Sequence, residues 1–133
     1  MEEDFVQALL DNAALAALVG TRITWMSRPQ GAGLPAVVLQ VVSSPRDYTM
    51  DRRESLERPL IQIDIWGGDY PTAKITTRAV MAALDTLRTA PFLGAFIETE
   101  RDNWEAGDGP QSDNSTDFFR VSLDVRLAYR NAA

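Results

Sequence analysis

Residues 59–87 limit the possible folds of this 133-residue chain more than any other segment. Isoleucines alternate with other side chains there, which is the pattern of a strand with one buried face. One face would hold Ile61, Ile63 and Ile65, and the other Gln62, Asp64 and Trp66. Gly67-Gly68 ends the strand, and Asp69 and Pro71 are typical of a helix cap and first turn. The segment therefore predicts a strand, a tight turn and a helix that continues to residue 88.

Hydrophobic spacing predicts the other elements. A helix is expected over 4–19, with Gly20 as its C-terminal stop because glycine readily adopts a left-handed conformation. Further strands are expected at 21–26, 35–44, 95–104 and 116–130, and loops at 28–33, 45–58 and 105–115. The order is α-β-β-β-α-β-β. It predicts a single α+β domain over residues 1–133, with one mainly antiparallel sheet and two helices on one face.

Composition excludes several classes of function. The chain contains no cysteine and no histidine, so it cannot supply thiolate chemistry or a Ser-His-Asp device by itself. Its net charge of −6 argues against direct nucleic-acid recognition. The acidic start of the chain and its short apolar runs predict neither a signal peptide nor a membrane span. No cofactor and no metal are expected.

The ordered set of segments resembles the tail completion, or tail terminator, family of long-tailed phages and phage-derived particles such as gene transfer agents. A leading helix ends in Leu18-Val19-Gly20-Thr21-Arg22-Ile23. A proline-led strand, Pro35-Ala36-Val37-Val38-Leu39-Gln40, comes next. Gln62-Ile63-Asp64-Ile65-Trp66 then precedes a helix with Ala73 and Ala82-Ala83-Leu84, and a long strand closes the chain. No single motif is specific, but the ordered set covers nearly the whole length.

The resemblance implies a structural virion protein and not an enzyme. It implies a homo-oligomeric ring, a hexamer by family analogy, at the head-proximal end of the tail. Such a ring stops polymerisation of the tail tube protein and joins the tail to the head connector or stopper protein. The chain would be made in the bacterial cytoplasm and would end in the virion tail. Another head–tail connection protein, an adaptor or a stopper, is the first alternative.

Two surfaces are candidates for contacts in such a ring. The first is the polar side of the strands, read either as a solvated sheet face or as a subunit interface. Its residues are Asp64, Trp66, Arg120, Asp124, Arg126 and Arg130. The second is the charged loop at 45–58, read either as solvated or as a partner-contact loop. Its residues are Arg46, Asp47, Tyr48, Met50, Arg52 and Arg53.

A small acidic enzyme or ligand-binding domain is the remaining alternative. Glu98, Glu100 and Asp102 would share a face if 95–104 is a regular strand, and paired carboxylates can serve as acid and base. A deep pocket lined by these glutamates and a tryptophan would favour that interpretation. A metal site at Asp102, Asp108 and Asp113 has only weak support, because their spacing matches no calcium loop.

Overall fold

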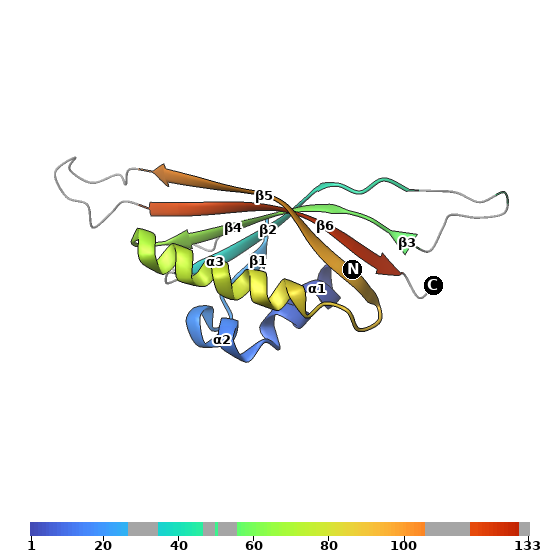
Figure 1. The fold of residues 1–133 in the computed structure, drawn as a ribbon, viewed down its shortest axis with the longest axis horizontal. Coiled ribbons are helices and arrows are strands. Elements are labelled where there is room, and N and C mark those ends of the chain that lie inside the picture. Colours follow the sequence, from blue (N-terminus) through green and yellow to red (C-terminus); the bar gives the residue numbers. More distant parts are fainter. Residues whose placement is uncertain (27–34, 47–49, 51–55, 106–117, 131–133) are drawn as a thin grey trace.

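The computed structural model describes residues 1–26, 35–46, 50, 56–105 and 118–130. In this part of the chain, three helices lie on one side of a six-stranded, strongly twisted sheet (Figure 1). The helices are α1 (Glu2–Leu10), α2 (Ala13–Val19) and α3 (Tyr70–Asp85). The strands are β1 (Ile23–Trp25), β2 (Ala36–Ser43), β3 (Leu56–Glu57), β4 (Leu60–Gly67), β5 (Phe92–Glu105) and β6 (Phe118–Arg130). The predicted α+β class and mainly antiparallel sheet are confirmed.

The strand register determines which strands form the edges of the sheet. β2, β4 and β6 are joined by antiparallel pairing, and β1 adds to β2 in parallel. Glu57 of β3 and Phe92 of β5 are both partners of Tyr129, so β3 and β5 lie on opposite sides of β6. β3 therefore extends the line of β4 beyond Arg58 and Pro59. β5 and β1 are the two lateral edges of the sheet.

The predicted helix over 4–19 is in fact two helices, α1 and α2. This corrects the expected element order, and the described residues contain three helices where two were expected. The side chain of Asn12 accepts a hydrogen bond from the backbone N–H of Leu15 at 3.0 Å and begins α2 anew. A capping asparagine competes with the helical backbone in this way, so α1 ends before it. Gly20 ends α2 with a positive φ of 60°.

Two further boundaries differ from the prediction. The short strand β3 lies inside the segment expected to be a loop, where Leu56 and Glu57 pair with the end of β6. β5 begins at Phe92 rather than at 95, and register shifts follow Phe92 and Ile97. The prediction missed both because neither segment shows regular alternation of apolar residues.

The strand, turn and helix predicted at 59–87 are confirmed. The three isoleucines of β4 are fully buried, and Asp69 caps α3 by accepting a hydrogen bond from Thr72 N–H at 2.7 Å. One stripe of α3 packs on the sheet; its members, Ala73, Thr76, Val80, Ala83 and Leu84, are buried. Burial of apolar surface between β4, β6 and α3 is the main source of stability.

The N-terminal helix is held against the same layer by an aromatic group. Phe5 lies between Trp25 and Phe92, with ring centroids 6.2 and 6.3 Å away. Tyr129 donates a hydrogen bond from its hydroxyl to Asp4, and this carboxylate raises the pKa of Tyr129 to about 12. The two ends of the described chain are thus linked through α1 and β6.

The turn after β4 provides a matched test of close packing. A Cβ at Gly67 would lie 2.9 Å from the backbone nitrogen of Ala73, whereas one at Gly68 would meet nothing within 4 Å. We expect Gly67→Ala to lower the free energy of unfolding by about 1–3 kcal/mol, because the backbone of α3 must shift. Gly68→Ala should change it by less than about 0.5 kcal/mol. Urea denaturation measures both, and equal effects would contradict the packing described here.

Candidate functional site

The polar side of β4 and β6 faces away from the helices and contains most of the predicted interface residues. The register pairs Asp64 with Ser122, and Trp66 with Arg120. Gln62 is paired with Asp124 in the same way. Partners across an antiparallel pair share a face, so these side chains form one continuous polar face. We call it the polar face below.

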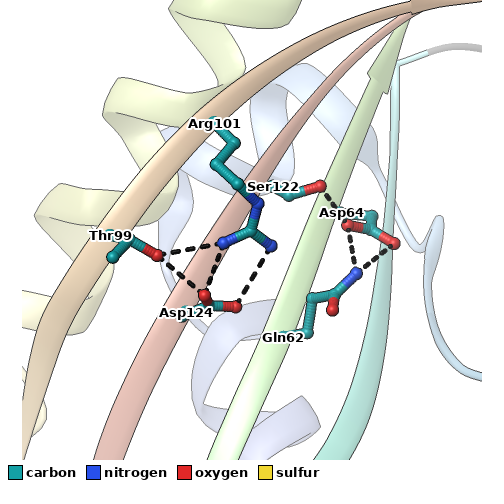
Figure 2. Close-up of polar contacts among 6 residues, drawn as sticks. All are labelled: Gln62, Asp64, Thr99, Arg101, Ser122 and Asp124. Atoms are coloured by element: carbon teal, nitrogen blue, oxygen red, sulfur yellow. Dashed lines mark hydrogen bonds and ion pairs between the residues drawn. The ribbon is translucent and has the colours of Figure 1, made fainter.

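Asp124 is at the centre of the first cluster on this face, shown in Figure 2. The guanidinium of Arg101 on β5 donates to both of its carboxylate oxygens, at 2.5 and 3.3 Å. Thr99 donates a third hydrogen bond at 2.7 Å. Arg101 first, and Thr99 second, hold the pKa of Asp124 below its ordinary value. The carboxylate is therefore ionised and already paired within the chain.

Asp64 forms the second cluster, on the β4 side of the first. The buried hydroxyl of Ser122 donates to it at 2.7 Å, and the Gln62 amide donates to both carboxylate oxygens at 3.0 and 3.2 Å (Figure 2). These two donors are neutral, and the nearby guanidinium of Arg101 is also attracted to the Asp64 carboxylate. The polar face thus contains a carboxylate held in a fixed position by hydrogen bonds.

The ends of the polar face contain its aromatic and cationic side chains. The guanidinium carbon of Arg120 lies 5.3 Å from the ring centroid of half-buried Trp66, a cation–π arrangement. Arg126 contacts Glu98 through Nε at 3.2 Å and donates to the carbonyl of Arg58 at 3.0 Å. Arg130 lies exposed at the end of β6. An interface role for these residues stays a prediction.

The predicted carboxylate row on β5 is wrong. The register shift after Ile97 places Glu98 beside Arg126, whereas Glu100 and Asp102 point to α3. Lys74 Nζ lies 3.1 Å from Glu100 and 2.7 Å from Asp102, and Tyr70 donates to Asp102 at 2.8 Å. Lys74 and then Tyr70 lower the pKa of Asp102. Glu100 and Asp102 therefore link β5 to α3 through ion pairs with Lys74.

The acidic-enzyme and metal alternatives find no support in the described geometry. A groove of about 630 Å³ lies between the end of α3 and the start of β5. Neither Glu98 nor Glu100 lines this groove. Within residues 1–26, 35–46, 50, 56–105 and 118–130, no group of three acidic side chains is arranged to hold a metal ion. Asp108 and Asp113 lie outside the described residues.

Only part of the predicted partner-contact loop is described. Arg46 donates to the side chain and carbonyl of Ser44, and its guanidinium lies 3.8 Å from Glu57 of β3. Met50 is fully exposed. Asp47, Tyr48, Arg52 and Arg53 lie outside the described residues, so the contact role of this loop stays a prediction.

Sequence reasoning missed Arg101 and Thr99 on the polar face, because the register shift in β5 changes which residues share a face. The position of Ser122 needs no such information, since Ser122 alternates with buried Val121 and Leu123 along the strand.

Comparison with known proteins identifies the family. The model of the family described as "Tail completion protein gp17" matches residues 3–130. No curated protein sequence matches the chain. One similar solved structure is a chain of the "Virion of native gene transfer agent (GTA) particle", with 20% identity and a TM-score of 0.62. The similarity covers 94% of this chain and 90% of that one, and at this identity it shows a shared fold.

The chain belongs to the tail completion protein family and is a structural protein of a phage-type tail. The family predicted from the sequence is confirmed. None of the helices in the part of the chain that the structure describes has the length and apolarity needed to cross a membrane.

The paired carboxylate at Asp124 predicts a defined pH dependence. Its lowered pKa means that the pair stabilises the fold above about pH 4, the ordinary range of the carboxyl, and that this contribution is lost as the pH falls further. We expect Asp124→Asn to lower the melting temperature at pH 7. The difference from the unchanged protein should shrink towards zero below pH 4.

Thermal melts followed by circular dichroism from pH 7 to pH 2 measure this difference. Arg101→Gln removes the other partner and should lower the melting temperature at pH 7 as well. A difference between Asp124→Asn and the unchanged protein that persists undiminished at pH 2 would show that the charge pair is not its source.

Proposed function

We propose that this protein forms a ring at the head-proximal end of a phage-type tail, where it stops growth of the tube and joins the tail to the head connector. The family match over residues 3–130 carries this proposal. The fold shared with a gene transfer agent virion chain supports it. Six copies is the number that family analogy favours.

The proposed mechanism has two steps. Binding of the ring to the last tube ring covers the surface on which tube subunits would add, so polymerisation stops. The opposite rim of the ring then offers a docking surface to the connector. Both steps need only surfaces that become buried on assembly, so no bond is made or broken and no cofactor takes part.

The state of the charged groups fits a binding role. Asp124, Asp102 and Glu98 each have a cationic partner within the chain. A carboxylate with a lowered pKa beside an arginine or lysine is a poor proton donor near neutral pH. Such pairs fix the shape and charge pattern of a surface, which governs the register and orientation of partners more than affinity.

A stopper or adaptor would bind a different neighbour. A tail terminator should copurify with the tail tube protein from cells that lack heads. A protein of the connector should instead copurify with portal-side proteins from cells that lack tails. Pull-down from both backgrounds separates the two roles.

Deletion of the gene is the direct test of the proposed role. We expect tails of abnormal length and free heads, because tube growth has no stop and the connector has no docking surface. Negative-stain electron microscopy of lysates measures tail length and head attachment, and a plasmid copy of the gene should restore both. Tails of normal length joined to heads in the deletion strain would refute the role.

A further inference from the structure

The two lateral edges of the sheet differ from each other, and in the part of the chain that the structure describes neither has a further strand beyond it. Beyond β6, β5 presents a 14-residue edge, Phe92–Glu105. On the other side, β1 covers only Val37 to Leu39 of β2. Within the described residues, no strand pairs with Val41–Ser43 on that side. Unpaired edges of this kind are available for strand addition by another chain.

Exposed apolar side chains concentrate at these two edges. On β5, Leu93, Phe96 and Ile97 are 51%, 61% and 37% exposed. At the other edge, Met26 and Val42 are 69% and 50% exposed. The first group adjoins the groove formed with the end of α3, whose rim includes Asp85 and Arg88. We call the two groups the β5 patch and the β2 patch.

The register places the two patches at the same level of the sheet. Ile97 is next to Val125, Val125 is next to Ile61, and Ile61 is next to Val41. The adjacent row runs from Phe96 through Arg126 and Leu60 to Ser43. Each row therefore begins beside the β5 patch and ends beside the β2 patch. A head-to-tail contact that repeats around a ring requires two different patches of this kind.

Strand direction allows the two edges to meet. β2, β4, β6 and β5 alternate in direction, so β5 runs opposite to β2. A neighbouring copy in the same orientation would place its β2 antiparallel to this β5, which continues the alternation of the sheet. An isologous contact between two β5 edges would leave both β2 patches exposed.

Charge differs between the two edges but contributes little to the contact. β5 includes four acidic residues and one arginine, and Glu98, Glu100 and Asp102 already pair with Arg126 or Lys74. The described residues 21–26 and 35–46 at the other edge include two arginines and no acidic residue. The apolar patches and the strand direction therefore carry the proposed contact.

We propose that the occupant of the β5 edge is the β1–β2 edge of a second copy of this chain, so that the β5 patch of each subunit contacts the β2 patch of the next around the ring. This inference rests on the proposed ring. It adds which two surfaces of each subunit meet when the ring closes.

The lack of cysteine in the chain permits a clean crosslinking test. Phe96→Cys and Val42→Cys are combined in one chain, and phage-type particles assembled with it are treated with a short thiol-to-thiol crosslinker. We expect a ladder of covalent oligomers up to the size of the closed ring. Each single variant should remain monomeric on denaturing gels, because the contact joins two different sites.

Ile75→Cys combined with Phe96→Cys is the matched control. Ile75 is also apolar and 50% exposed, but it lies on α3 and not at a sheet edge. This pair should give no ladder. All the substituted sites are exposed, and thermal melts check that each variant folds.

The other outcomes overturn the proposal in distinguishable ways. Dimers formed by Phe96→Cys alone would show an isologous β5 contact. Particles that contain the double variant but give no ladder would disprove the edge contact and leave the tail role intact. If the unsubstituted protein is itself not found in the particles, both proposals are overturned.

Discussion

The antiparallel pairing of β4 with β6 organises this molecule. One side of the pair buries Ile61, Ile63 and Ile65 with Val121, Leu123 and Val125 under the helices. Because side chains alternate, the same pairing aligns Gln62, Asp64 and Trp66 with the polar residues of β6 on the other side. A slip of one residue would exchange the two faces, so burial of the core fixes the polar face as well.

The charged groups follow from this arrangement. On the outer side, Arg101 from β5 pairs with Asp124, and on the inner side Lys74 from α3 holds Glu100 and Asp102. β5 is therefore tied to both neighbouring layers through residues after Ile97. The first part of β5, where Leu93, Phe96 and Ile97 are exposed, is held instead by pairing with β6 and by buried Phe92, which packs on Phe5 and Tyr129. The strand is thus anchored at both ends and exposes apolar side chains near its start.

The sequence predicted the elements that depend on local chemistry and strong alternation. The isoleucine strand, the Asp69 cap and the closing strand needed no tertiary information. The break at Asn12 was missed because apolar spacing continues across it, although asparagine is a common cap. The prediction of a carboxylate row on β5 was wrong because of a register shift in that strand. The shift depends on pairing with β6 and has no clear signature in the sequence. The polar face was predicted in outline, and its partners on β5 were not.

Electron cryomicroscopy of the native particle tests the central claim most directly. The account predicts a ring of copies of this chain between the last tube ring and the head connector, with its surfaces buried against both. A map that places the chain elsewhere in the particle, or as a single copy that contacts no neighbouring copy, would contradict it.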